Sequence, residues 1–144
     1  MQNILVLCIG NICRSPMAEG LLKHAFPGKT VRSAGIKALI GKPADPFSVQ
    51  LMAEQGIDIS THRAQNISTC LVNEAKLILV MDLDQKKYVE TKYVASRGKV
   101  FRLGGFKKID IADPYREGIE SFRAAYRLID DSVKVFTEQI AQMS

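Results

Sequence analysis

The stretch that decides the fold is NILVLCIGNICRSP, residues 3–16. From Asn3 to Cys8 it is a short, continuous apolar run with several branched side chains, which predicts a buried strand. Ser15 and Pro16 predict the start of a helix, with the serine as N-cap and the proline in the first turn. Residues 9–14 are then a tight loop that leads from a strand directly into a helix.

The rest of the chain repeats this alternation. Further strands are predicted at residues 29–33, 77–81 and 100–103. Helices are predicted from Asp45-Pro46 to Gly56, over residues 82–96, and from Glu117 onward, where apolar residues recur at helical spacing. This order indicates an α/β fold with a mostly parallel sheet, in one domain over residues 1–144. Ligands of such sheets bind beyond the carboxyl ends of the strands, where the loop after Cys8 is expected.

Composition and charge exclude several classes of function. The 144-residue chain has a net charge of +5, and its Lys and Arg residues are scattered among acidic ones, so nucleic-acid binding receives little support. No apolar segment reaches bilayer-spanning length, and the first residues lack the features of a secretory signal. Cys8, Cys13 and Cys70 have no zinc-type spacing. We therefore expect a cytoplasmic protein with reduced thiols, no metal site and no stable membrane insertion.

Cys8, Arg14 and Ser15 have the spacing C-x5-R-S, which in a strand–loop–helix setting indicates a phosphate-binding loop. A thiol that faces converging backbone N–H groups is favoured as a nucleophilic thiolate, and Ser15 can donate a hydrogen bond to the same sulfur. Arg14 offers a planar fork for two phosphate oxygens. Gly10 and Asn11 tolerate the positive φ angles of a tight anion cradle. The remaining loop residues are Ile9, Ile12 and Cys13.

A purely structural interpretation of these residues also exists. A cysteine at a strand end is usually an inert small hydrophobic residue, and an arginine is usually a surface charge. The combination of Cys8, Arg14 and Ser15, with a strand before them and a helix after them, favours the functional interpretation.

The chain resembles the low-molecular-weight protein-tyrosine-phosphatase family, whose pattern is C-x-x-N-x-C-R-S near the N-terminus and D-P-aromatic near the C-terminus. The resemblance covers the whole chain, with matching stretches in the family's order at residues 8–15, 33–35, 44–46, 59–62, 80–82 and 113–115. It implies a flavodoxin-like fold, with a mostly parallel four-stranded sheet and helices on both faces. It also implies hydrolysis of protein phosphotyrosine through a cysteinyl-phosphate intermediate on Cys8, without a cofactor.

The resemblance also implies roles for residues outside the loop. Asp113 matches the general acid that later acts as the base, and Tyr115 matches the wall of the slot for the substrate ring. Ser33 and His62 match positions that hydrogen-bond with Asn11 and fix the loop. Considered alone, Asp113 before a proline is also typical of an Asx-turn that precedes a helix. An acid is nevertheless needed near the loop, because a departing phenolate requires a proton.

Leu39 and Ile40 match the family's variable loop beside the site, where vertebrate members carry an aromatic residue. With Tyr115 they are expected to form the wall around the substrate ring. In this loop the chain is similar to bacterial members that are paired with exopolysaccharide tyrosine kinases. The implied partners are tyrosine-phosphorylated proteins, in particular a cognate tyrosine autokinase. Gln65 stands where an arginine is frequent in the family.

Two other functions are compatible with the same loop. Thioredoxin-coupled arsenate reductases share the fold and the loop, but they need two further cysteines close together, and only Cys70 lies outside the loop here. A non-catalytic phosphotyrosine-binding module would need neither a nucleophile nor an acid, whereas this chain has candidates for both in Cys8 and Asp113.

Overall fold

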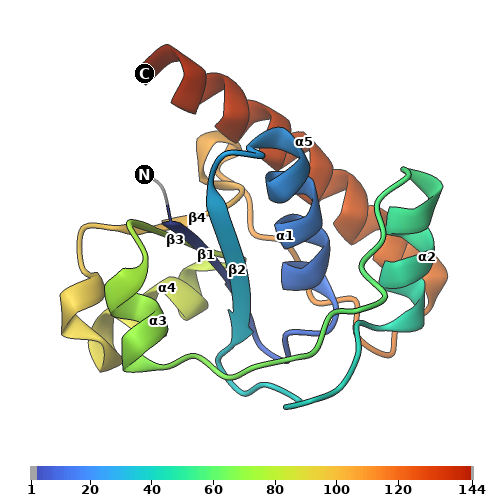
Figure 1. The fold of residues 1–144 in the computed structure, drawn as a ribbon, viewed down its shortest axis with the longest axis horizontal. Helices are drawn as coiled ribbons and strands as arrows, with labels where there is room; N and C mark the ends of the chain where they lie inside the picture. Colours follow the sequence, from blue (N-terminus) through green and yellow to red (C-terminus); the bar gives the residue numbers. More distant parts are fainter. Residues whose placement is uncertain (1–2, 144) are drawn as a thin grey trace.

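Four parallel strands form a single sheet in the computed structural model, which describes residues 3–143 (Figure 1). The strands are β1 (Asn3–Cys8), β2 (Thr30–Gly35), β3 (Leu77–Val80) and β4 (Val100–Arg102). Their order in the sheet is β2-β1-β3-β4, and every neighbouring pair is parallel. The predicted α/β fold with a four-stranded sheet is therefore confirmed, and the sheet is entirely parallel.

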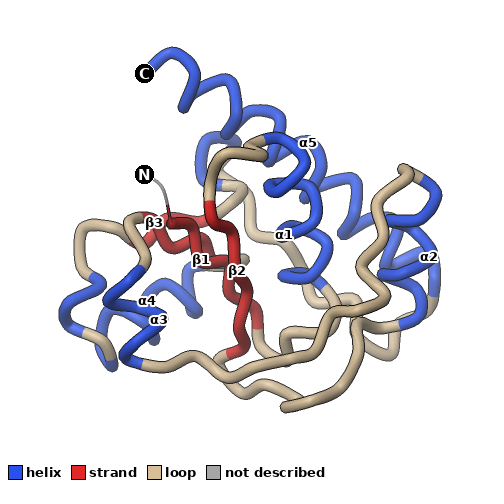
Figure 2. Tube along the Cα trace, in the orientation of Figure 1, coloured by secondary structure: helices blue, strands red, loops and turns tan. Residues whose placement is uncertain are grey.

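Helices cover both faces of this sheet (Figure 2). The helices are α1 (Arg14–Ala25), α2 (Pro46–Glu54), α3 (Thr69–Glu74), α4 (Leu83–Lys92) and α5 (Ile119–Met143). Helices α1 and α5 lie on one face, with α2 packed beside them, whereas α3 and α4 lie on the other (Figure 1). Short 3-10 turns, η1 (Val94–Ser96) and η2 (Gly105–Lys107), flank β4.

The alternation of side chains along β1 divides the core in two. Ile4, Val6 and Cys8 belong to the core shared with α1 and α5, whereas Leu5 and Leu7 belong to the core shared with α3 and α4. All five are at most 3% exposed. A strand buried on both faces reads as a continuous apolar run, which is why it was recognisable in the sequence. The same alternation places the side chain of Cys8 on the α1 side of the sheet.

Local signals at helix ends were partly interpreted correctly. Asp45 is the N-cap of α2 and its Oδ1 accepts a hydrogen bond from the Phe47 N–H at 3.0 Å, as predicted. The prediction that Ser15 is an N-cap is wrong: α1 begins at Arg14, and Ser15 lies within it. The Ser15 hydroxyl instead bonds to side chains of the preceding loop. Tertiary contacts have taken over the group that would otherwise cap the helix.

Two other helical segments differ from the sequence prediction. Helix α3 was not predicted, because its six residues are too few to show a period; its N-cap is Ser68, whose Oγ accepts from the Leu71 N–H at 3.2 Å. The predicted helix over residues 82–96 is shorter: α4 ends at Lys92, and η1 follows as a separate turn.

Gly35 ends β2 at a point where two backbones come very close. It pairs with Cys8 in the sheet, and the next residue, Ile36, donates its N–H to the Cys8 carbonyl at 2.9 Å. A Cβ atom on Gly35 would lie 2.5 Å from the Ile9 carbonyl oxygen and 2.9 Å from the Ala38 Cα. Glycine is therefore required here for close approach of the backbone to the loop after β1.

We expect Gly35→Ala to lower the free energy of unfolding by about 1–3 kcal/mol, because neither backbone neighbour can move away without shifting the loop. Urea unfolding measures this change. Gly28→Ala is the matched control, since a Cβ there meets nothing within 4 Å, and it should stay within about 0.5 kcal/mol of the wild type. Equal stability of the two variants would contradict the required close approach.

Candidate active site

The loop between β1 and α1 has its carbonyl groups turned outward. Six successive carbonyl oxygens, from Cys8 to Cys13, each accept a hydrogen bond from another part of the chain. The donors, in that order, are Ile36 N (2.9 Å), Lys37 N (2.9 Å), Leu39 N (3.0 Å), His62 Nε2 (2.7 Å), Asp45 N (2.8 Å) and Ser48 Oγ (3.1 Å). With the negative ends of these peptide dipoles held outside, the inside of the loop is favourable for an anion.

The sulfur of Cys8 receives two hydrogen bonds inside this loop. The Asn11 N–H donates to Sγ at 3.3 Å, and Ser15 Oγ lies 2.9 Å from Sγ. Ser15 Oγ also accepts a hydrogen bond from Asn11 Nδ2 at 2.8 Å, which leaves its hydroxyl hydrogen available. When Cys8 is a thiolate the sulfur has no hydrogen, so the Ser15 hydroxyl is then the donor. Two donors on one sulfur suit a nucleophile or a leaving thiolate.

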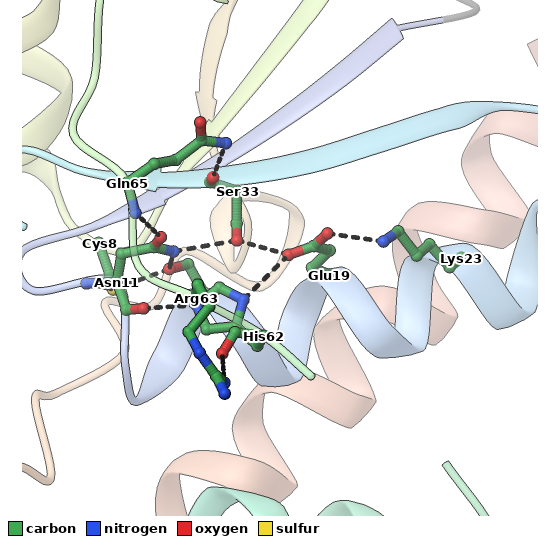
Figure 3. A network of polar contacts seen from close by, with 9 residues as sticks. Cys8, Asn11, Glu19, Lys23, Ser33, His62, Arg63 and Gln65 are labelled. Atoms are coloured by element: carbon green, nitrogen blue, oxygen red, sulfur yellow. Dashed lines mark hydrogen bonds and ion pairs between the residues drawn. The ribbon is translucent and has the colours of Figure 1, made fainter. Parts of the chain in front are cut away.

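Asn11 is the centre of the supporting network (Figure 3). It is fully buried and has φ of 60°, the left-handed conformation that the sequence predicted for it. Its Nδ2 also donates to Ser33 Oγ at 2.9 Å, and its Oδ1 accepts from the Gln65 N–H at 2.9 Å. His62 Nε2 donates to its carbonyl. The structure thus brings Asn11, Ser33 and His62 together, whereas Gly10 has no positive φ angle and that expectation is wrong.

Arg14 is buried at the base of α1 and faces the segment that follows β4. Its Nη1 donates to the Ile111 carbonyl at 2.7 Å, and its Nη2 lies 3.7 Å from Asp113 Oδ2. Asp82 Oδ2, at the end of β3, lies 3.9 Å from Nη1. Among the described residues, Nε has no hydrogen-bond partner although the side chain is only 3% exposed. A guanidinium with donors to spare in a closed site fits bidentate binding of an oxyanion.

Asp113 combines the turn and the site position that the sequence left as alternatives. Its Oδ1 accepts from the Tyr115 N–H at 3.0 Å, which is an Asx-turn. Its Oδ2 faces Arg14, and the side chain is 46% exposed. One carboxylate oxygen therefore shapes the loop while the other is presented to the pocket.

The pocket above the sulfur brings most of the predicted residues together. It is lined by Cys8, Ile9, Gly10, Ile12, Cys13, Arg14, Lys37, Leu39, Asp113 and Tyr115. Ile40 is not among the lining residues and is 71% exposed outside it. Burial, followed by the negative charge of Asp45, raises the pKa of Cys13, so that this second sulfur remains a thiol.

Several residues of the site were not identified from the sequence. Glu19 accepts from Ser33 Oγ at 2.5 Å and lies 3.8 Å from His62 Nδ1 (Figure 3). Its position four residues after Ser15 places it on the same side of α1, which was a usable signal. The Ile111 carbonyl and Lys37 had no such signal. Cys70 is exposed on α3 and does not line the pocket.

The described residues include no group of three or more His, Cys, Asp or Glu side chains arranged to hold a metal ion. No described helix is both long enough and apolar enough to cross a membrane.

Comparisons with known proteins match the whole chain. Residues 3–144 match the model of the low molecular weight phosphotyrosine protein phosphatase family. The probable low molecular weight protein-tyrosine-phosphatase EpsP of Ralstonia nicotianae is 51% identical over 140 residues, 97% of each chain. Vibrio vulnificus Wzb in complex with benzylphosphonate is similar in structure, with a TM-score of 0.92 and 39% identity over 95% of this chain and 97% of that one.

The chain is also similar to a solved structure of a phosphatase that is named for a different substrate, arginine. The YwlE arginine phosphatase from Geobacillus stearothermophilus has a TM-score of 0.93 and 31% identity, over 99% of this chain and 95% of that one. The fold therefore accommodates more than one phosphorylated amino acid, and the identity of the residue must come from closer relatives.

The fold and the anion-binding loop after β1, together with the match to the family model, define a phosphatase, and relatives such as EpsP place it among those that act on phosphotyrosine. The chain belongs to the low molecular weight phosphotyrosine protein phosphatase family. The fold and the protein-tyrosine-phosphatase activity that the sequence implied are thereby confirmed.

We expect Asn11→Gly to keep the left-handed backbone and lose the side-chain bonds to Ser15, Ser33 and Gln65. Buried partners left unsatisfied cost about 3 kcal/mol of unfolding free energy in total, and a displaced loop lowers kcat/KM by roughly 100-fold. Urea unfolding and hydrolysis of para-nitrophenyl phosphate measure the two effects. Asn11→Ala adds left-handed strain and should be about 1 kcal/mol less stable again. Wild-type stability and activity of Asn11→Gly would show that the network is dispensable.

Proposed function

We propose that this phosphatase works by double displacement on Cys8, with Arg14 as the phosphate clamp and Asp113 as the general acid and base. The observation that supports this most strongly is the state of the sulfur: it receives hydrogen bonds from Ser15 and Asn11 at the floor of a pocket. The same pocket is lined by Arg14 and Asp113. Nucleophile, clamp and acid thus face one another across a space that suits a phosphorylated ring.

In the first step the Cys8 thiolate attacks phosphorus in line with the bond to the tyrosyl oxygen. A sulfur–phosphorus bond forms, and the phosphorus–oxygen bond breaks with its electron pair on the tyrosyl oxygen. Asp113 gives that oxygen a proton. Arg14 and the inward N–H groups of the loop stabilise the charge on the three equatorial oxygens.

In the second step a water molecule attacks the phosphorus of the cysteinyl-phosphate. The Asp113 carboxylate removes a proton from this water, and the sulfur–phosphorus bond breaks with its electron pair on Sγ. The Ser15 hydroxyl, already directed at Sγ, stabilises the departing thiolate. Inorganic phosphate leaves, and Cys8 and Asp113 return to their initial protonation states.

We further propose that the physiological substrate is a cognate tyrosine autokinase linked to exopolysaccharide or capsule production, and that the enzyme acts in the cytoplasm. The Leu39-Ile40 loop supports this, because it lacks the aromatic residue of vertebrate members. Similarity to EpsP and to Wzb, both bacterial, supports the same assignment. Benzylphosphonate, bound by Vibrio vulnificus Wzb, joins a ring to a tetrahedral anion, which is the chemistry of phosphotyrosine.

The acid role of Asp113 is tested with Asp113→Asn, which keeps an oxygen for the Tyr115 N–H and removes the proton donor. We expect kcat/KM for phenyl phosphate to fall by about 100- to 10,000-fold. Phenol has a pKa of about 10, so phenolate is a poor leaving group unless it is protonated as it leaves. Para-nitrophenyl phosphate, with a more stable leaving anion, should lose far less. The ratio kcat/KM is used because it reports the first step alone when that step is irreversible.

A similar loss with both leaving groups would assign Asp113 to the turn and would place the acid elsewhere. Asp113→Ala, which removes the turn acceptor as well, serves as the comparison. It should show the same dependence on the leaving group together with a lower free energy of unfolding.

The substrate is tested with the phosphorylated tyrosine kinase of the organism's own exopolysaccharide system. We expect the wild type to remove its phosphotyrosine with kcat/KM at least about 10-fold above that for unrelated phosphotyrosine proteins, through added contacts worth about 1.4 kcal/mol. Folded Cys8→Ser should bind the phosphorylated kinase without turning it over. An enzyme that ignores the kinase but hydrolyses unrelated phosphotyrosine contradicts the partner. Efficient hydrolysis of a phosphoarginine protein, without hydrolysis of phosphotyrosine, would contradict phosphotyrosine as the substrate.

A further inference from the structure

The wall of the pocket contains a second cation besides Arg14. Lys37 lines the pocket with Leu39, Asp113 and Tyr115, and its side chain is exposed. It makes no ion pair with any residue that the structure describes. The other cation of the pocket, Arg14, is buried and lies near the carboxylates of Asp82 and Asp113. Lys37 is therefore the positive charge that remains open to a bound segment.

The backbone of Lys37 is fixed relative to Cys8. Its N–H donates to the Ile9 carbonyl at 2.9 Å, and the Leu39 N–H donates to the Gly10 carbonyl at 3.0 Å. Between them, the Ala38 N–H donates to Asn66 Oδ1 at 2.9 Å. The flexible stem of lysine thus starts from a rigid point on the rim, and its ammonium can reach groups beside the bound phosphotyrosine.

A second exposed cation, Arg116, directly follows Tyr115, which also lines the pocket. The guanidinium carbon of Arg116 lies 5.1 Å from the centre of the Tyr115 ring, a cation–π contact. Arg116 has φ of 65°, a conformation that costs a non-glycine residue about 1 kcal/mol or more. In the part of the chain with described positions, it forms no ion pair. Two unpaired cations thus stand on two separate segments, one on the pocket wall and one against the ring of the neighbouring wall residue.

We propose that Lys37 and Arg116 make the site selective for phosphotyrosines that have an anionic group beside them in the sequence. Neighbouring Cα atoms are about 3.8 Å apart, so residues flanking a bound phosphotyrosine pass over this rim. A carboxylate of Asp or Glu and the phosphate of an adjacent phosphotyrosine have the required charge. Lys37 and Arg116 are then specificity-determining residues. This inference rests on the proposed function, because it concerns the same pocket.

Exposed ion pairs are weak, so each cation should contribute about two- to fivefold in kcat/KM. The test uses phosphotyrosine peptides of equal length whose flanking residues are Asp, a second phosphotyrosine, Ala or Lys. At low salt the wild type should prefer the Asp-flanked and doubly phosphorylated peptides over the Ala-flanked peptide by roughly tenfold. The preference should shrink as salt rises, because exposed charges are screened.

The variants are compared by the ratio of kcat/KM for the Asp-flanked and Ala-flanked peptides, which cancels any general effect on the pocket. Lys37→Gln and Arg116→Gln should each lower this ratio about threefold, and together by roughly tenfold. Lys37→Glu should abolish the preference, because Arg116 still attracts the anion, and Lys37→Glu combined with Arg116→Gln should reverse the order, so that the Lys-flanked peptide becomes better than the Asp-flanked one. A purely structural role of Lys37 could not produce this reversal.

Lys76→Gln is the matched control. Lys76 is also exposed and forms no ion pair with a described residue, but it precedes β3 at the opposite end of the sheet. The Lys76→Gln substitution changes the net charge equally and should leave the ratio unchanged.

An effect of Lys76→Gln equal to that of Lys37→Gln, or no flanking preference in the wild type, would overturn the inference while phosphotyrosine hydrolysis stands. If the wild type did not hydrolyse phosphotyrosine at all, the proposed function itself would be overturned. A preference for the doubly phosphorylated peptide alone would identify the anion as phosphate.

Discussion

The outward hydrogen bonding of six successive carbonyls is the constraint on which the rest of the site depends. A loop that must offer N–H groups to an anion has to dispose of its carbonyl oxygens, because each would repel the same anion and would be costly to bury without a partner. The donors come from residues 36–39, 45–48 and His62, three separate parts of the chain. The positions of β2, α2 and the segment after it are thus tied to the orientation of six peptide groups.

The fold was largely predictable because its two central strands, β1 and β3, are buried on both faces. Such strands appear as unbroken apolar runs, and the runs at β1 and β3 needed no other information. Helix α2 was equally clear from Asp45 and Pro46. Prediction failed where two roles were assigned to one side chain and the structure uses only one of them. Ser15 has the properties of a cap, but the sulfur of Cys8 and the amide of Asn11 take its hydroxyl group. The sequence indicated the hydrogen bond between Ser15 and the Cys8 sulfur, but not that this bond would replace the capping role of the same hydroxyl.

The residues of the candidate site also divide into those that were predictable from the sequence and those that were not. Cys8 and Arg14 were identified from their spacing and from the chemistry of phosphate binding, and Asp113 from the family resemblance and the need for a proton donor. The structure places all three around one pocket. The Ile111 carbonyl that holds Arg14 could not be identified from the sequence, because every residue has a backbone carbonyl and the residue type gives no signal. This bond matters because it ties Arg14, the proposed clamp, to the segment that carries Asp113, the proposed acid. Glu19 was overlooked for another reason: an acid on a helix surface is usually solvated, so its spacing from Ser15 was not used. The contacts with Ser33 and His62 show that this acid belongs to the site.

The dependence of the loop on three distant segments has a consequence for the life of the polypeptide before and after folding. In a nascent or unfolded chain those segments are absent from the neighbourhood of Cys8, the carbonyls are free to turn, and neither donor is aimed at the sulfur. Such a chain carries an ordinary cysteine. The arrangement of hydrogen bonds around the Cys8 sulfur therefore forms only with tertiary assembly of the loop and these three segments.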